Sequence, residues 1–288
     1  MKKLIDLHTH SVCSDGSMTP RELVAHAKKE GIAAIALSDH DCLDGIRDAM
    51  DEGEKLGVEI IPAIEFSVVS DTETHILGYF IDPETDAMKD AMQRIIAARA
   101  YRAKVTLEKL NELGLPITED EVKKVAGGTL FCRAHYARVL MDKGLVPSVK
   151  EAFDKYLANG RPAYCGHQAI TAEEAIDLIH KAGGIAFVAH LHLIRLSDEE
   201  LYAFLTRLKA AGLDGIEGYY TEYTPEMQEK FQRIARELGL QISGGTDFHA
   251  AMKPHIAIGR GTGNLEIPYE ALENLKIYYK NKKEGTSK

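Results

Sequence analysis

Two histidines and an aspartate stand at alternate positions near the start of the chain, as Asp6, His8 and His10. Alternate residues of a β-strand point to the same side of a sheet, so this spacing would place all three on one face, with the imidazoles at the strand's end. Imidazoles and carboxylates gathered in this way bind divalent metal ions. The spacing therefore predicts a metal site; the alternative is a strand that carries two hydrogen-bonded histidines by chance.

Further candidate ligands follow other expected strands. We expect all of them at or just beyond the carboxyl end of a strand: His8, His10, His40, Glu65, His75, His190, Glu217, Asp247 and His249. In a barrel of parallel strands this end carries the active site, whereas histidines with structural roles would scatter over both ends. The regular placement favours a metal site over chance.

Together with Asp15, these residues exceed what one ion can use, so we expect two or three divalent ions bridged by a carboxylate. Two ions about 3.5–4 Å apart bind the attacking and leaving oxygens of a phosphoryl transfer and lower the pKa of bound water to about 7. The expected reaction is hydrolysis of a phosphate ester by a metal-activated hydroxide. The donor types suit Mn²⁺, Fe²⁺ or Zn²⁺.

Strands and helices alternate around these residues. Sequences typical of helix capping boxes begin at Thr19, Thr171 and Ser197, and the apolar runs 32–37 and 185–189 have the composition of buried parallel strands. These signals predict an α/β fold with a single barrel domain. We expect the final residues, 280–288, to form a frayed tail.

The strand signal gives way to helical periodicity in the middle of the chain. We expect helices near residues 87–113, 119–126, 133–143 and 148–158. The predicted organisation is a barrel of residues 1–86 and 167–288 that contains an inserted, mainly helical cap subdomain of residues 87–166.

Charge is distributed unevenly between the expected barrel and the insert. The chain has a net charge of −9, but residues 96–168 carry twelve Lys and Arg against eight Asp and Glu, or +4, which leaves −13 elsewhere. An acidic body suits bound cations, and a basic insert suits a phosphate-bearing ligand. Ordinary solvated helix faces would explain most of the individual charges equally well.

Composition also bounds the class of protein. No apolar run approaches the roughly 20 residues of a membrane span, and Asp6 interrupts the first apolar stretch, so we expect a cytoplasmic protein without a signal peptide or membrane contact. The four cysteines are widely spaced, which argues against a disulfide framework and a zinc knuckle. No helix-turn-helix, zinc finger or long basic stripe predicts duplex DNA binding, and no obligate protein partner is evident.

The motifs resemble those of the polymerase-and-histidinol-phosphatase (PHP) superfamily of metal-dependent phosphoesterases. The resemblance covers nearly the whole chain and follows the order of its motifs: Asp6-x-His8-x-His10, Asp39-His40-Asp41, Glu65-Phe66-Ser67, His75-Ile76-Leu77-Gly78-Tyr79, Ala189-His190 and Asp247-Phe248-His249. It implies a distorted seven-stranded (β/α) TIM-like barrel with a trinuclear site.

The resemblance also implies an assignment of ligands. One ion would be held by His8, His10, Glu65 and Asp247, a second by Glu65, His75 and His190, and a third by Asp15, His40 and His249. Asp6 and Asp39 would orient imidazoles. For Glu217 we favour a supporting role over direct ligation.

Within the superfamily, the insert and the segment Arg133-Ala134-His135 resemble the branch that removes the 3′-phosphate of 3′,5′-bisphosphonucleosides and trims short 5′-phosphorylated oligoribonucleotides. The resemblance implies that Arg133 binds phosphate, with His135 as a helper or an acid. For Arg138 a surface salt bridge is at least as good an interpretation. Where the branch has a Pro-Gly-Arg-like sequence after the barrel histidine, this chain has His190-Leu191-His192, so we expect Arg195 to substitute in substrate binding.

Two alternatives stay open. Histidinol-phosphate phosphatase uses the same kind of barrel, although a basic insert would repel the ammonium group of histidinol. A metal-binding module that supports a partner without catalysis would lack some of the ligands, and here every ligand position is filled.

Overall fold

The computed structural model describes residues 3–70, 72–126, 131–166 and 169–286. Seven strands form one sheet in the order of the sequence, because each strand pairs with the next. The strands are β1 (Leu4–Thr9), β2 (Ile32–Leu37), β3 (Glu59–Ser67), β4 (His75–Tyr79), β5 (Ile185–Val188), β6 (Gly215–Tyr220) and β7 (Gln241–Gly245).

The sheet curves into a nearly closed barrel. A bridge between Thr9 and Phe248 joins the end of β1 to the chain that follows β7. All neighbouring strands are parallel except β4, which runs antiparallel to both β3 and β5. The prediction of a distorted seven-stranded α/β barrel is confirmed, and the reversed β4 is the main distortion.

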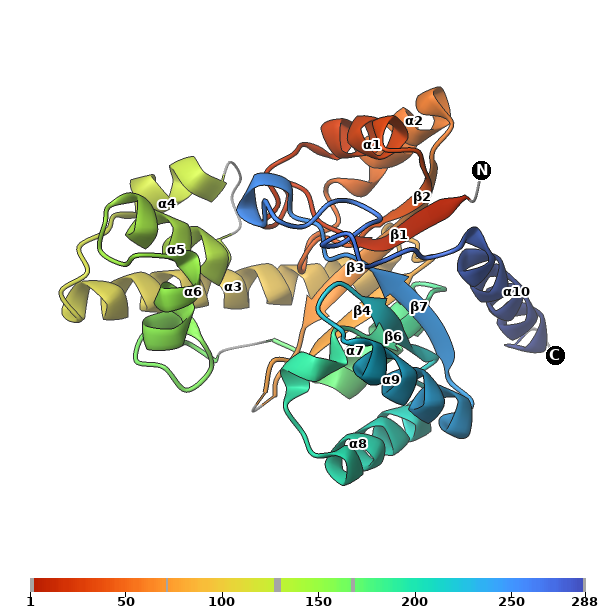
Figure 1. The fold of residues 1–288 in the computed structure, drawn as a ribbon. Helices are drawn as coiled ribbons and strands as arrows, with labels where there is room; N and C mark the ends of the chain where they lie inside the picture. Colours follow the sequence, from red (N-terminus) through yellow and green to blue (C-terminus); the bar gives the residue numbers. More distant parts are fainter. Residues whose placement is uncertain (1–2, 71, 127–130, 167–168, 287–288) are drawn as a thin grey trace.

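Five helices pack against the outside of the barrel (Figure 1). They are α1 (Pro20–Lys29), α2 (Ile46–Leu56), α7 (Ala172–Lys181), α8 (Asp198–Ala210) and α9 (Pro225–Leu238). The capping boxes expected at Thr19, Thr171 and Ser197 are present, each with a side-chain oxygen that accepts a hydrogen bond from the third helical N–H. Each box begins a helix that returns the chain between consecutive strands.

A helical arm projects from the barrel after β4 (Figure 1). It begins with the long helix α3 (Asp86–Glu112), and it continues through α4 (Glu119–Ala126), α5 (Arg133–Asp142), α6 (Val149–Ala152) and the π-helix η1 (Phe153–Leu157). The single helix expected near 148–158 is therefore two short pieces. The arm has its own apolar core, in which Leu110, Val122 and Leu140 pack together.

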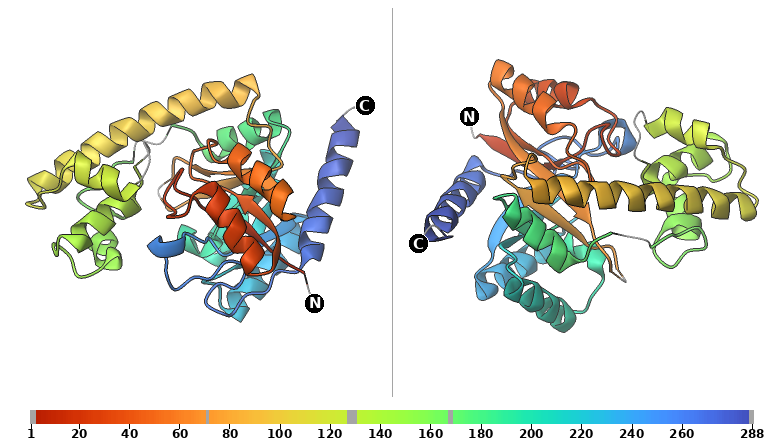
Figure 2. Two further views of the ribbon diagram at one scale, coloured as in Figure 1. Left: turned by 90° about the horizontal axis from the view of Figure 1, so that it is seen from above. Right: turned by 180° about the vertical axis from the view of Figure 1, so that it is seen from behind.

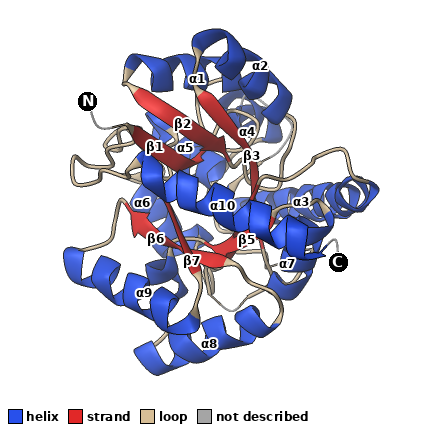
Figure 3. Ribbon diagram, turned by 90° about the vertical axis from the view of Figure 1, so that its right-hand side faces the viewer, coloured by secondary structure: helices blue, strands red, loops and turns tan. Residues whose placement is uncertain are grey.

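Helix α10 (Tyr269–Thr286) lies across the end of the barrel remote from the arm (Figures 2 and 3). Leu272 and Leu275 of this helix pack against Ile5 and Phe187 in the barrel core. The expectation of a frayed tail from residue 280 is wrong up to Thr286, because the helix continues to that residue; residues 287–288 lie outside the described part. None of the described helices has the length and apolarity to cross a membrane.

Candidate metal centre

The candidate ligands gather at the end of the barrel opposite α10. His8 lies in β1, His10 follows it, His40 follows β2 and Glu65 lies near the end of β3. His75 differs from the prediction, because it is the first residue of β4 and not the last. Since β4 runs antiparallel to its neighbours, its amino end meets their carboxyl ends, and His75 still reaches the same rim.

Four side chains form the innermost group, namely His8, His10, Glu65 and Asp247. Glu65 Oε2 lies 3.2 Å from His8 Nε2 and 3.3 Å from His10 Nε2. Asp247 Oδ1 lies 3.2 Å from His10 Nε2 and 3.6 Å from His8 Nε2. All four residues are buried. Two imidazole nitrogens and two carboxylate oxygens thus enclose one small volume.

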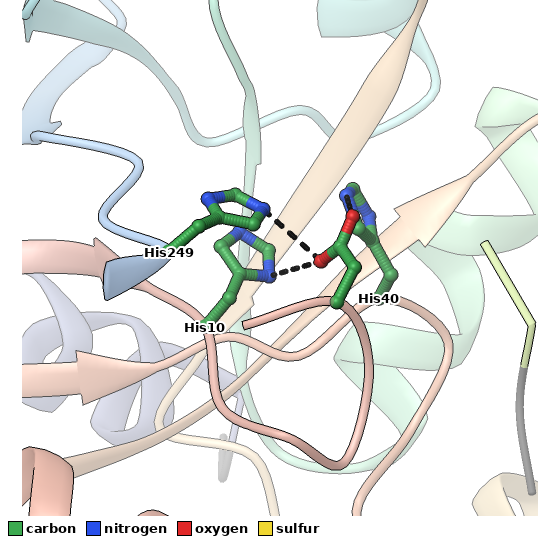
Figure 4. Close-up of side chains that lie close together, drawn as sticks. His10, His40 and His249 are labelled. Atoms are coloured by element: carbon green, nitrogen blue, oxygen red, sulfur yellow. Dashed lines mark ion pairs between the residues drawn. The ribbon is translucent and has the colours of Figure 1, made fainter. Parts of the chain in front are cut away.

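A second group joins His10, Asp15, His40 and His249. The rings of His10 and His249 stack with centroids 4.2 Å apart, and the centroid of the His40 ring lies 4.7 Å from that of His10 (Figure 4). Asp15 Oδ1 lies 3.0 Å from His249 Nε2, and its Oδ2 lies 3.9 Å from His40 Nε2. His249 Nδ1 donates a hydrogen bond to the backbone oxygen of Asp247, which leaves its Nε2 to face Asp15.

Glu65 also belongs to a third group, with His40 and His75. Its Oε2 lies 3.1 Å from His40 Nδ1, and its Oε1 lies 2.9 Å from His75 Nδ1. His190 Nε2 is 2.9 Å from the same Oε1 atom. Glu65 is therefore the carboxylate shared among the groups.

Buried polar atoms without hydrogen bonds indicate that the cluster fits divalent cations. His8 Nε2, His10 Nε2, His40 Nδ1 and Glu65 Oε2 are buried and make no hydrogen bond to any described residue. An unsatisfied buried polar atom costs about 1–3 kcal/mol. Four such atoms in one cluster would be satisfied together by bound cations.

Charge coupling dominates the cluster in the absence of metal. Burial alone would raise the pKa of Glu65, but the neighbouring His40, His8 and His75 outweigh it and hold this pKa well below its ordinary value. Burial opposes protonation of His10, but Asp247 and Glu65 outweigh it and raise the pKa of His10 to about 9. The carboxylates therefore stabilise positive charge, which a divalent ion would supply in place of protons.

Backbone strain coincides with the cluster. Asp41, His190 and Asp247 adopt positive φ angles of 50°, 26° and 57°. This region is unfavourable for residues other than glycine and is retained mainly at functional sites. The strain turns the chain sharply just beyond the strand ends, where the candidate ligands lie.

Glu217 lies behind the cluster. Its Oε1 is 2.9 Å from His8 Nδ1, and its Oε2 accepts a hydrogen bond from the backbone N–H of His190. Because Glu217 holds the Nδ1 side of the ring, His8 Nε2 points toward Glu65. This geometry supports the predicted supporting role, although β6 continues past Glu217 to Tyr220.

Asp6 and Asp39 differ from the prediction that they orient imidazoles. Asp6 accepts hydrogen bonds from the backbone N–H groups of His8, Thr246 and Gly259 and from the Thr246 hydroxyl. Asp39 accepts from Ser11 and Ser14, and neither aspartate hydrogen-bonds an imidazole among the described residues. Both carboxylates therefore hold the loops that carry the candidate ligands. In the folded chain the donors nearest to them are backbone N–H groups and hydroxyls, not imidazoles.

A cavity of about 320 Å³ opens beside the cluster and is lined by both the barrel and the arm. Arg133, at the first position of α5, faces it and pairs with Glu73, with 2.7 Å between Nη2 and Oε1. Arg138 also lines it and forms the expected salt bridge, with Asp142. Arg195 does not line the cavity; it is exposed at the end of the short helix η2 (Leu191–Ile194), and we assign it no role there.

His135 is buried beneath the cavity wall and is not among the lining residues. Its Nδ1 accepts a hydrogen bond from the backbone N–H of Cys132, so its proton resides on Nε2. Burial lowers the pKa of His135, which keeps the ring neutral at pH 7. His135 is thus a neutral ring that caps the first turn of α5. This geometry does not support the prediction that His135 acts as a general acid.

Several residues of the site escaped the sequence analysis. Lys253 Nζ lies 2.5 Å from Asp247 Oδ2, and the Tyr220 hydroxyl donates to the same oxygen. Arg99 on α3 forms a buried ion pair with Asp41, 2.5 Å between Nη1 and Oδ2. The Asp39-His40-Asp41 motif could have indicated a role for Asp41 in the site. No local sequence pattern indicates a lysine or an arginine whose partner lies on another element.

Comparison with known proteins explains this geometry. The sequence pattern of the PHP domain matches residues 6–158. The chain belongs to the PHP family. It is a metal-dependent phosphoesterase of this family and hence a hydrolase, as the sequence predicted.

Relatives cover most of this PHP protein. A 5′-3′ exoribonuclease of Haemophilus influenzae is 36% identical over 86% of this chain and 91% of its own length. A 3′,5′-nucleoside bisphosphate phosphatase of Chromobacterium violaceum is 33% identical over 91% of both chains.

Solved structures share the PHP barrel. A Chromobacterium violaceum protein described as an amidohydrolase, with bound sulfate and no metal, superposes with a TM-score of 0.82 at 33% identity over 86% of this chain and 88% of that one. A Bifidobacterium adolescentis protein classed with the metal-dependent phosphoesterases gives a TM-score of 0.83 at 29% identity over 95% of both chains.

Proposed function

We propose that this phosphoesterase removes the 3′-phosphate from 3′,5′-bisphosphonucleosides and also trims short 5′-phosphorylated oligoribonucleotides. The observation that carries the proposal is the cavity of about 320 Å³, because the His and carboxylate cluster and several arginines of the arm line the same space. This volume suits a small, charged ligand such as a nucleotide. The names of the relatives, an exoribonuclease and a bisphosphate phosphatase, agree with such a substrate.

Two or three divalent ions, Mn²⁺, Fe²⁺ or Zn²⁺, would occupy the cluster. We assign one to His8, His10, Glu65 and Asp247, one to Asp15, His40 and His249, and one to Glu65, His75 and His190. When bound, such ions neutralise the phosphoryl oxygens and lower the pKa of the attacking water. The protein's contribution is to hold the donor atoms in place before the substrate arrives.

Arg133 would bind the outer oxygens of the reacting phosphate through its planar fork. Glu73 accepts a hydrogen bond from Nη2 of this fork, so a phosphate that binds both nitrogens would displace that carboxylate. His135 would act as a positioning residue, because its Nδ1 fixes the backbone at Cys132, directly before Arg133. The arm, residues 87–166, would serve as the cap that places these groups over the barrel.

The experiment is release of inorganic phosphate from 3′-phosphoadenosine 5′-phosphate in the presence of Mn²⁺. We expect turnover by the wild type and a loss of roughly 10³-fold in His8→Ala, as for removal of a preorganised charge-stabilising group. His255→Ala is the matched control, because His255 is exposed and does not line the cavity. Equal turnover by wild type and His8→Ala would contradict the metal mechanism.

Parallel assays separate the alternatives. Preferred hydrolysis of histidinol phosphate would replace the nucleotide assignment, and the arginines that line the cavity disfavour that cationic substrate. Metal binding without hydrolysis of any phosphate ester would favour a non-catalytic module.

A further inference from the structure

Four arginines of the arm line the cavity, and three of them have a carboxylate partner of their own. Arg99 pairs with Asp41, Arg133 with Glu73 and Arg138 with Asp142, at 2.5 Å, 2.7 Å and 2.9 Å. The fourth, Arg102, makes a single ion pair among the described residues, at 3.9 Å to Asp41. Among these four arginines, Arg102 therefore has the weakest pairing with a carboxylate.

Asp41 cannot serve both arginines equally. Its Oδ2 atom already lies 2.5 Å from Arg99 Nη1, and the same oxygen is the one at 3.9 Å from Arg102 Nη2. Its Oδ1 accepts a hydrogen bond from the backbone N–H of Ser67. Each oxygen of Asp41 thus already has a closer donor, and the guanidinium of Arg102 makes no hydrogen bond to a described residue.

The surroundings make this state unfavourable for the free protein. The side chain of Arg102 is only 20% exposed, so water screens its charge incompletely. Burial and the positive charge of Arg99 lower the pKa of Arg102. A half-buried guanidinium with unused N–H donors gains most from a planar anion with several oxygens, and phosphate meets this requirement in a bidentate manner.

We propose that Arg102 binds the second, non-reacting phosphate of the substrate and thereby sets the preference for bisphosphorylated over monophosphorylated nucleotides. This inference rests on the proposed function. Asp41 follows His40 directly in the chain, so Arg102 lies next to the cluster and within the same cavity. A nucleotide with one phosphate at the cluster and Arg133 would present its other phosphate to a separate cation.

Arg133 and Arg102 differ in a way that supports this division. Arg133 is paired with Glu73 at 2.7 Å, which a phosphate would have to displace, whereas the carboxylate oxygen paired with Arg102 lies 3.9 Å away. The aromatic ring of Phe131 also lines the cavity and would offer an apolar surface to the nucleoside.

The test compares kcat/KM for adenosine 3′,5′-bisphosphate and adenosine 3′-monophosphate in the Mn²⁺-loaded enzyme. We expect Arg102→Gln to lose about 10- to 100-fold on the bisphosphate, as for loss of a charged hydrogen-bonded pair, and to stay within about 2-fold on the monophosphate. Arg102→Lys keeps the charge without the fork and should fall between. Arg94→Gln is the matched control, since Arg94 lies on the same helix as Arg102, is exposed and does not line the cavity.

A binding measurement gives a readout independent of turnover. Calorimetry should show that Arg102→Gln weakens adenosine 5′-monophosphate, the product that retains the second phosphate, by the same factor, and leaves adenosine unchanged. Thermal unfolding checks that each variant is folded, and Arg102→Lys replaces Arg102→Gln if the latter is not.

The outcomes are distinguishable. If the wild type releases phosphate from the bisphosphate but Arg102→Gln loses equally on both substrates, or on neither, the inference on Arg102 is overturned and the proposed function stands. If the wild type releases phosphate from neither nucleotide, the proposed function fails and the inference fails with it.

Discussion

The barrel rim and the helical arm contribute to one cavity in different ways. At the rim, His8, His10 and Glu65 are fully buried, and several of their polar atoms lack hydrogen bonds within the described chain. On the arm, Arg133 and Arg138 are 30% and 38% exposed and already have carboxylate partners. On the proposed function, the rim would hold its unsatisfied ligand atoms for cations, while the arginine Arg133 of the arm would exchange its carboxylate partner for a substrate phosphate.

This difference has a structural cause. Most rim residues lie on, or within a few residues of, a strand of the hydrogen-bonded sheet, which fixes their positions. The arm residues lie on helices that pack around a separate apolar core. We therefore expect substitutions on the arm to change substrate preference and to leave the arrangement of the rim unchanged.

The largest effect is expected at the rim, from removal of the Glu65 carboxylate that the ligand groups share. We expect Glu65→Gln to lose roughly 10³-fold in phosphate release, because Glu65 belongs to two of the ligand groups and contacts His190 as well. The control is Glu59→Gln, at the other end of the same strand, where Glu59 pairs with Lys276. Similar losses in both variants would mean that β3 as a whole, and not the rim, is responsible.

The residue that supports His8 should have the next largest effect. Glu217→Gln removes the charge that holds Nδ1 of His8, so we expect metal affinity to fall about 10- to 100-fold while the fold is retained. Titration calorimetry with Mn²⁺ measures the affinity. An unchanged affinity would show that the strands alone orient the ring.

The opposite end of the barrel should respond in stability and not in chemistry. Asp214 lies before β6 and contacts His180, Lys282 and Tyr278, which ties α10 to the barrel. Burial would raise its pKa, but these hydrogen bonds outweigh burial and lower it. Because the folded pKa lies below the unfolded value of about 3.9, the stabilisation is full above that value and disappears as the pH falls through the folded pKa.

We therefore expect Asp214→Asn to lower the free energy of unfolding by about 2 kcal/mol at pH 7, with the difference from wild type shrinking below about pH 4. Urea unfolding at several pH values measures it. Metal affinity should be unchanged. A stability difference that is constant with pH would argue against the ionised carboxylate as the cause.

The smallest effect is expected on the arm side. Glu73→Gln removes the carboxylate that competes for Arg133, so we expect KM for the bisphosphate to fall about 2- to 5-fold, since partly exposed pairs contribute up to about 1 kcal/mol. Steady-state kinetics separate KM from kcat, and kcat should change little. A rise in KM would show that Glu73 orients Arg133 for the substrate instead of blocking it.

Local patterns in the sequence determined the barrel, the capped helices and the set of candidate ligands. Strand periodicity places His8 and His10 on one face, and capping boxes act within four residues, so neither depends on distant parts of the chain. The position of His75 was inferred for the wrong reason, because strand direction depends on which strands become neighbours.

Tertiary structure alone decided which side chains meet. Glu73 and Arg133 are 60 residues apart, and Asp6 and Thr246 are 240 residues apart. No local period encodes such pairs, because they depend on how the arm leaves the barrel and how the loops close over its rim. Hence the sequence identified the candidate metal ligands, whereas the contacts of Asp6, Asp39, Arg102 and Lys253 emerged only when the folded chain brought their partners together.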